Sequence, residues 1–376
     1  MYPNTLLDLL TATGLALATL HFSIPLAYYA YMRRFYSKEA HAGNNSGPNH
    51  MPSMSIVVPT YNEAKFIVEK LDNIYLQDYP KDRLEIIVVD SGSTDGTPEK
   101  ILEWSKNHPD ITVKLVREPV RRGKGYALNE ALKHASGEIF VATDADSKWL
   151  RGDALKKAAT YLSSPDIWAV SCVKIPEASG PGGVEASYRD FYNVLRIAES
   201  NLHSTPVFHG ELAAFKRKAL EEVGGFPTDI GADDSHTATL IALKGYRAII
   251  AGDIVCSEAV PRKGYHAWRV RRAQHLVQHF AKSIVILPRA PRGFRLVLAA
   301  EAFLHLANPL ILLAAAALLA TSAAMGNTIA LALLLVGMAL LLYKPYRTWI
   351  ATQLYLLAAM ARNLWTREIV WRKTEK

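Results

Sequence analysis

The sequence has only two cysteines among its 376 residues, Cys172 and Cys256, and they lie far apart. So few thiols exclude a secreted disulfide scaffold and argue against a zinc site built on cysteine. The sequence contains neither the Gly-x-Gly-x-x-Gly fingerprint of dinucleotide dehydrogenases nor the Walker loop of P-loop enzymes, which argues against both classes. Apolar residues make up 50% of the chain and charged residues 21%, a balance that excludes an intrinsically disordered protein.

Basic residues outnumber acidic residues by 43 to 35, which gives a formal net charge of +8. Such an excess indicates a polyanionic partner, either nucleic acid, nucleotide phosphates or the anionic face of a membrane. Many of the basic residues flank the ends of long apolar runs. We therefore expect the lipid bilayer as a partner and no nucleic acid.

The first apolar run extends from about Leu6 to Tyr31 and exceeds the roughly 20 residues that span a bilayer. It is too long for a signal peptide, and basic residues follow it rather than precede it. Because Arg33, Arg34 and Lys38 come directly after this run, the positive-inside rule places the N-terminus outside and the next segment in the cytoplasm.

Two further apolar runs, at about 296–324 and 328–343, are separated by Gly326-Asn327 and predict a transmembrane hairpin. The tail from Trp349 mixes tryptophans with basic residues, which favours an interfacial amphipathic helix over a fourth span. We expect three spans, with four as the alternative. The predicted segments are an N-terminal transmembrane helix and linker (1–50), a cytoplasmic catalytic domain (51–262), interfacial amphipathic helices (263–294), a transmembrane hairpin (295–345) and a basic interfacial helix (346–376).

The segment between about Met54 and Ala259 alternates apolar strands with helices. Expected strands are 55–59, 84–90, 111–116 and 138–143, and the expected helices between and around them are 62–76, 97–107 and 124–134. Continuous apolar strands separated by helices predict an α/β fold with a mostly parallel sheet covered on both faces. In such sheets, ligands bind at the carboxyl ends of the strands.

Polar residues follow the first two of these strands. Pro59-Thr60-Tyr61-Asn62-Glu63 ends the first strand and Asp90 ends the second. A carboxylate there can accept hydrogen bonds from a nucleobase or a ribose, although turn formation and helix capping are the simpler explanation for part of this polarity. Further along, the basic run at 121–125, which includes Lys124, precedes a helix and is suited to a diphosphate.

Asp144 and Asp146 follow an apolar strand with one residue between them. Alternation along the strand points both carboxylates the same way, and a hard divalent cation between them would offset their repulsion. Asp233 and Asp234 precede another helix. They either cap that helix or supply a general base.

Together these motifs resemble glycosyltransferase family 2 with the GT-A fold, in particular the membrane-attached branch that includes polyprenol-phosphate sugar synthases and β-glycan synthases. The resemblance covers about Ser55 to His275. The roles that it implies are as follows: Pro59, Tyr61, Glu63 and Asp90 hold the base and ribose, Lys124 lies by the nucleotide, Asp144 and Asp146 bind Mn²⁺ or Mg²⁺ with the diphosphate, and Asp234 is the catalytic base.

Processive members of the family carry Gln-x-x-Arg-Trp after the base, whereas the matching stretch here is Arg271-Arg272-Ala273-Gln274-His275. The altered motif argues against long-chain processive synthesis. Arg271 and Gln274 remain candidates for contact with the acceptor or the diphosphate, and a role at lipid headgroups is the alternative.

The resemblance implies an inverting hexosyltransferase that uses a nucleotide sugar, either GDP-mannose or a UDP-hexose, and acts on a glycan or lipid-linked acceptor at the cytoplasmic membrane face. A polyprenol-phosphate sugar synthase is the alternative within this class. A non-catalytic membrane scaffold is the alternative of another class, and it would be expected to have lost the acids that this chain keeps. The sequence does not specify the sugar, the acceptor, a third metal ligand or the oligomeric state.

Overall fold

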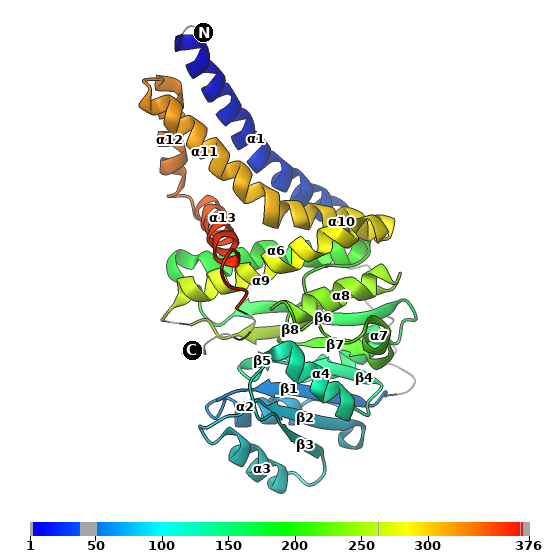
Figure 1. Ribbon diagram of the computed structural model, residues 1–376. Coiled ribbons are helices and arrows are strands. Elements are labelled where there is room, and N and C mark those ends of the chain that lie inside the picture. Colours follow the sequence, from blue (N-terminus) through cyan, green and yellow to red (C-terminus); the bar gives the residue numbers. More distant parts are fainter. Residues whose placement is uncertain (1–2, 38–50, 262, 369, 371–376) are drawn as a thin grey trace.

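The computed structural model describes residues 3–37, 51–261, 263–368 and 370. Figure 1 shows an α/β domain from which a group of long helices projects, with α6 (Val184–Leu202) and α9 (Tyr265–Ile286) lying between the sheet and those helices. Most of the predicted linker within 1–50 lies outside the described residues.

The α/β domain contains a mixed, mostly parallel sheet of eight strands in the order β3-β2-β1-β4-β7-β6-β8-β5. Its strands are β1 (Met54–Thr60), β2 (Leu84–Asp90), β3 (Thr112–Arg117), β4 (Ile139–Ala142), β5 (Ser147–Trp149), β6 (Ile167–Pro176), β7 (Ala213–Lys216) and β8 (Arg247–Glu258). β1 pairs in parallel with β2 and β4, and β6 pairs in parallel with β8. The short strands β5 and β7 are antiparallel to their neighbours. The predicted α/β class is therefore confirmed.

Alternating side chains of the strands pack against helices on both faces of the sheet. On one face, Ile56 and Val58 belong to a core with α2 (Ile67–Tyr75), α3 (Thr97–Asn107) and α5 (Ala154–Leu162). On the other face, Val57 belongs to a core with α4 (Lys124–His134), α7 (Arg217–Val223) and α8 (Asp233–Leu243). The period of two along β1 explains why neighbouring residues enter different cores.

The chain after β1 differs from the prediction. A helix was expected from residue 62, but α2 begins at Ile67. Asn62 has a φ of 56°, in the left-handed region, and the carbonyl of Glu63 accepts hydrogen bonds from the amides of Phe66 and Ile67. This turn keeps residues 61–66 out of the helix, at the carboxyl end of the strand.

Two described helical segments are long and apolar enough to cross a membrane, one within α1 (Pro3–Tyr36) and one at 292–324. The second is formed by α10 (Arg292–Ala302), a π-helical turn and α11 (Asn308–Ala324). α1 and α11 are joined by a hydrogen bond of 2.8 Å between the hydroxyls of Thr11 and Ser322.

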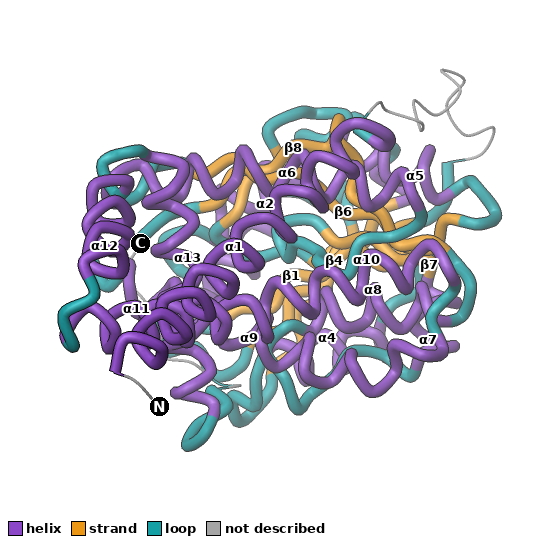
Figure 2. Tube along the Cα trace, turned by 90° about the horizontal axis from the view of Figure 1, so that it is seen from above, coloured by secondary structure: helices purple, strands orange, loops and turns teal. Residues whose placement is uncertain are grey.

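The predicted third span falls on a short helix. α12 (Thr328–Leu340) has 13 residues, which at 1.5 Å per residue is shorter than the roughly 30 Å hydrocarbon core. A third span is obtained only if α12 and α13 (Lys344–Asn363), which meet at 105°, count as one broken segment. Figure 2 shows α11, α12 and α13 gathered toward one side of the α/β domain. The number of spans stays a prediction.

A buried ion network joins α6 to the base of the second apolar segment. The guanidinium of Arg196 lies 2.7 Å from a carboxylate oxygen of Glu199 and 2.7 Å from one of Glu301. All three side chains are almost fully buried. The hydroxyls of Tyr28 and Thr205 also donate to Glu199. The single arginine therefore pairs with both acidic side chains and fixes α6 against α10.

We predict that Arg196→Met lowers the free energy of unfolding by about 3–5 kcal/mol, since it leaves the buried acids of this network without their cationic partner. Arg217→Met is the matched control, because the Arg217–Glu221 pair is exposed and should change stability by at most about 1 kcal/mol. Denaturant titration of both purified variants in detergent tests this. Equal stability of the two variants would contradict the assigned role of the network.

Candidate active site

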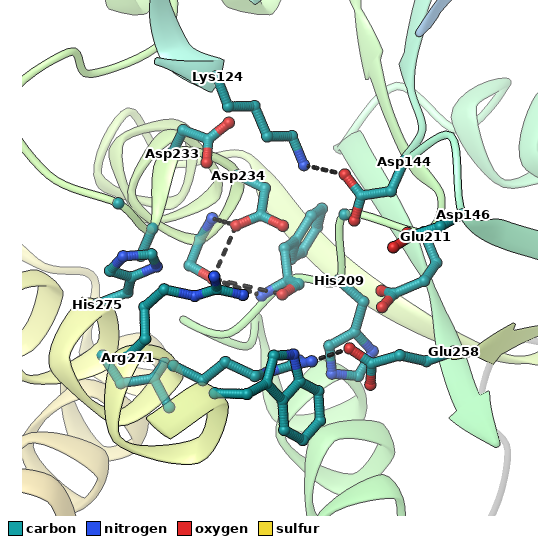
Figure 3. A pocket seen from close by; sticks show the side chains of 18 of the residues that line it. Lys124, Asp144, Asp146, His209, Glu211, Asp233, Asp234, Glu258, Arg271 and His275 are labelled. Carbon is teal, nitrogen blue, oxygen red and sulfur yellow. Dashed lines mark hydrogen bonds and ion pairs between the residues drawn. The ribbon is translucent and has the colours of Figure 1, made fainter. Parts of the chain in front are cut away.

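The main cavity of the described residues has a volume of about 310 Å³ and lies where the predicted strand ends meet α8, α9 and α13. Figure 3 shows that acidic side chains face it from two sides, with Asp144 and Asp146 opposite Asp233 and Asp234. The predicted site residues that line it are Pro59, Tyr61, Glu63, Lys124, Asp144, Asp146, Asp234 and Arg271. The structure thus brings residues from as far apart in the sequence as Pro59 and Arg271 together at one cavity.

Lys124 is one of the cations that line this cavity. It begins α4, and its Nζ lies 2.6 Å from Oδ1 of Asp144, two residues after the end of β4. Burial alone would lower the pKa of Lys124, but the surrounding carboxylates, Asp144 first among them, raise it above its usual value. Lys124 is therefore a fixed positive charge.

Gly210 allows these charged groups to approach one another. A Cβ at this position would lie 2.5 Å from Nζ of Lys124, 3.0 Å from Oδ2 of Asp144 and 3.3 Å from Oδ2 of Asp234. Its carbonyl also accepts a hydrogen bond of 3.0 Å from the amide of Asp144. A side chain here would occupy the space between the groups of the site.

Asp233 and Asp234 form the first turn of α8. Burial raises the pKa of Asp233 to about 7, with Lys124 opposing the shift and Asp234 adding to it. Burial also raises the pKa of Asp234. Oδ1 of Asp234 accepts a hydrogen bond of 2.7 Å from the amide of Ser235, which fixes the carboxylate at the cavity. A buried carboxylate with a raised pKa is suited to general-base chemistry.

The nucleotide side of the predicted site lies around the end of β1. The guanidinium of Arg121 stacks on the ring of Tyr61 at 4.1 Å from its centroid, and both residues line the cavity. Asp90 does not line it. Its carboxylate accepts hydrogen bonds from the hydroxyl of Thr60 at 3.3 Å and from the amide of Ser93 at 3.1 Å. Asp90 therefore organises the adjoining loops, and its contact with a ribose stays a prediction.

Asp144 and Asp146 provide oxygen donors for a divalent cation. The described residues contain no cluster of three or more histidine, cysteine or acidic side chains able to enclose a metal ion. The protein alone would thus supply about two ligands. Magnesium, and by the same chemistry manganese, is commonly held by one or two carboxylates together with substrate phosphates. The donor set fits a metal that binds with a diphosphate.

The predicted segment 271–275 divides between two surroundings. Arg271 and His275 line the cavity, and burial with the nearby Arg271 lowers the pKa of His275 to about 4. Gln274 faces away, where its amide donates to the side chain of Asn363 at 3.1 Å and to the carbonyl of Thr366. Gln274 therefore attaches α9 to the end of α13 and does not reach the cavity. Its expected contact with acceptor or diphosphate has no support in this arrangement.

Sequence reasoning did not identify a second group of cavity residues. They are Lys174, Tyr188, Arg189, Glu258, Trp268 and Arg272. The signal that could have found Lys174 is a lysine near the end of an otherwise apolar strand. The other residues come from separate segments, and no local pattern connects them.

Comparison with known proteins gives three similarities. The family model "Glycosyl transferase family 2" matches residues 55–224. A mannosyltransferase from Pyrobaculum calidifontis, solved in complex with GDP-Man and Mn²⁺, is 56% identical, with 96% of this chain and 100% of that chain covered and a TM-score of 0.87. The poly-beta-1,6-N-acetyl-D-glucosamine synthase of Staphylococcus epidermidis is 29% identical over 226 residues, which are 59% of this chain and 54% of that protein. The chain thus spans about half the length of that curated relative.

We predict that Gly210→Ala weakens binding of a nucleoside diphosphate with Mn²⁺ by about tenfold (about 1.4 kcal/mol), because the new Cβ would displace Lys124 and Asp144, which are assigned to the diphosphate and its metal. Gly152→Ala is the control, since a Cβ there would lie 3.8 Å from its nearest neighbour, at ordinary contact distance. Titration calorimetry measures both. Unchanged affinity in Gly210→Ala would show that the close approach is not needed for binding.

Proposed function

Because this chain belongs to glycosyltransferase family 2 and has the GT-A fold, we propose that it transfers mannose from GDP-mannose to a glycan or lipid-linked acceptor, with inversion at the anomeric carbon. The observation that carries the proposal is that Lys124, Asp144 and Asp234 face one cavity. The choice of donor rests on the similar mannosyltransferase, whose structure contains GDP-Man.

The departing diphosphate needs positive charge beside it. Asp144 and Asp146 would hold Mn²⁺ or Mg²⁺, which when bound offsets the negative charge that develops on the leaving group. Lys124 supplies a second, permanent charge, and it lies at the N-terminus of α4, where the helix dipole also favours an anion. Arg271 interacts electrostatically with Asp146 and extends this cationic side.

The loops after β1 and β2 are proposed to hold the nucleoside. Tyr61 offers an aromatic face and Glu63 a carboxylate at the cavity, and Pro59 shapes the end of β1. The amide of Glu63 is fixed by a hydrogen bond of 2.8 Å to the hydroxyl of Thr97. Asp90 orders the two loops through the hydrogen bonds that its carboxylate accepts from Thr60 and Ser93.

Asp234 is the proposed general base. It accepts the proton of the acceptor hydroxyl while the oxygen attacks the anomeric carbon from the face opposite the diphosphate. A single displacement without an enzyme nucleophile inverts the configuration, so an α-linked donor would give a β product. Because burial raises the pKa of Asp234 above its usual value, a growing share of the base is protonated as the pH is lowered, and the transfer rate should fall with it.

We further propose that the catalytic domain faces the cytoplasm and is held at a membrane by α1 and the 292–324 segment. Both are long and apolar enough to span. α9 and α13 would lie at the bilayer surface, where their basic residues meet lipid headgroups. The hairpin of α11 and α12 would place residue 327 outside.

With GDP-mannose, Mn²⁺ and an acceptor, Asp234→Asn should lower the rate of GDP release by about 10²–10⁴, since it keeps the shape of the side chain and removes the proton acceptor. GDP affinity should change little. Asp233→Asn is the matched control and should have the smaller effect on rate. If Asp233→Asn abolishes transfer while Asp234→Asn retains it, the base is assigned to the wrong residue. If the wild-type protein consumes UDP-hexoses but not GDP-mannose, the donor is wrong.

Cysteine-accessibility labelling tests the membrane topology. The two natural cysteines are buried, so introduced cysteines can be read separately. Asn327→Cys should react with an impermeant reagent from outside, whereas Ser163→Cys in the catalytic domain and Lys376→Cys should react only after permeabilisation. External labelling of Lys376→Cys would indicate a fourth span, and external labelling of Ser163→Cys would place the catalytic domain on the other side.

A further inference from the structure

Part of the cavity is lined by residues to which the proposed donor site assigns no role. Figure 3 shows Glu211 on the same side as Asp144 and Asp146, with Glu258 farther along the cavity wall. Lys174, Arg189 and Arg272 line the same part of the cavity. At first sight, so many cations would suit a phosphate group on the acceptor.

These cations, however, are engaged with carboxylates of the protein. Nζ of Lys174 lies 2.7 Å from Glu211 and 3.4 Å from Glu258. Arg189 lies 2.9 Å from Glu258, which Arg272 also contacts. The charges of this network largely compensate one another, so it has little positive charge left for an additional anion.

Arg269 is likewise engaged. It lies 3.1 Å from Glu185, and its guanidinium stacks over the ring of Tyr188 at 4.2 Å and faces Tyr355 at 5.5 Å. Glu185 also pairs with Arg189 at 3.1 Å. The two tyrosine rings and the carboxylate of Glu185 therefore hold Arg269 in place.

Glu211 provides the opposite kind of group. Only 2% of its surface is exposed, and its Oε1 pairs with Lys174. Its Oε2 lacks a hydrogen-bond partner among the described residues, although the residue lines the cavity. Burial raises the pKa of Glu211, but Lys174 and Arg272 outweigh it and hold the pKa well below its usual range. The unpartnered oxygen thus belongs to an ionised carboxylate.

The backbone of Glu211 is fixed beside the reacting groups. Its carbonyl accepts hydrogen bonds of 2.7 Å from the hydroxyl of Thr143 and 2.7 Å from the indole of Trp149. The preceding residue is Gly210, whose Cβ position lies within 3.3 Å of atoms of Asp144 and Asp234. Glu211 and Asp234 line the same cavity, so a single acceptor bound there can contact both.

We propose that Glu211 recognises a hydroxyl group of a sugar acceptor, and that the acceptor is a neutral sugar rather than a lipid phosphate. This inference rests on the proposed glycosyl transfer. Oε2 can accept a hydrogen bond from a hydroxyl, whereas it would repel a phosphate.

With such an acceptor, the sugar is transferred in a single displacement. A second hydroxyl of the sugar loses its proton to Asp234, and its oxygen forms the new bond to the anomeric carbon. The bond from that carbon to the diphosphate oxygen breaks, and its electron pair leaves with GDP. Glu211 forms no covalent bond and only positions the acceptor.

The test compares two acceptors, octyl α-D-mannoside and geranylgeranyl phosphate, with GDP-mannose and Mn²⁺. The wild-type protein should glycosylate the mannoside in preference to the phosphate. Glu211→Gln should lower kcat/KM for the mannoside by about tenfold or more, the loss typical of a hydrogen bond to a charged group, mainly through KM. The same variant should use the phosphate better than wild type does, because a repelling charge is removed.

Glu258→Gln is the matched control. It also removes a carboxylate partner of Lys174, but both of its oxygens are already paired, so the preference between the acceptors should persist. If wild type prefers the phosphate, or Glu211→Gln changes both acceptors alike, the inference is overturned while transfer from GDP-mannose stands. If neither acceptor supports GDP release and a UDP-hexose is consumed instead, the proposed donor fails independently of Glu211.

Discussion

The ion pair between Lys124 and Asp144 places one cation among carboxylates that would otherwise repel one another. Asp233 and Asp234 lie close enough for their charges to raise the pKa of the lysine. Gly210 makes the arrangement sterically possible, since a side chain there would meet the lysine, Asp144 and Asp234. One lysine does not neutralise this set of acids, and the remaining negative charge favours a divalent cation. Burial raises the pKa of both acids of α8, and the nearby carboxylate of Asp144 adds to the shift.

The strand ends, α9 and α13 hold these charged groups in place. The strand ends deliver Asp144 and the loop after β1, and α9 closes the cavity with Arg271 and His275. α13 in turn packs against α9, where Leu356 and Ala359 meet Ala273 and Val277. The buried Arg196 network connects α6 to the long apolar segment, so the catalytic domain and the projecting helices form one contiguous structure.

Local patterns in the sequence predicted much of this arrangement because each strand is a continuous apolar run that ends in polar residues. The bounds of β2, α3 and α4 agree with the sequence prediction. The turn at Asn62 was missed, because a left-handed residue leaves little trace in an apolar pattern. The orientation of Gln274 was also missed, since it depends on Asn363 at the far end of α13.

Ion pairs between residues far apart in the sequence could not be predicted from local patterns. Lys174, Glu211 and Glu258 come from β6, the loop before β7 and the end of β8, and their contacts appear only once the sheet order brings those strands together. The steric role of Gly210 emerges only from the distances around it. The family resemblance identified the acids by position, whereas the structure adds the charge balance that explains their chemistry.

The most direct test of this account is the affinity of the purified protein for Mn²⁺, measured by electron paramagnetic resonance with and without GDP. The protein offers about two carboxylate ligands, and Lys124 already occupies one side of Asp144. Mn²⁺ should therefore bind weakly alone and at least about tenfold more tightly with GDP, and by linkage Mn²⁺ should strengthen GDP binding by the same factor. Equal Mn²⁺ affinity with and without GDP would contradict a metal site completed by the diphosphate.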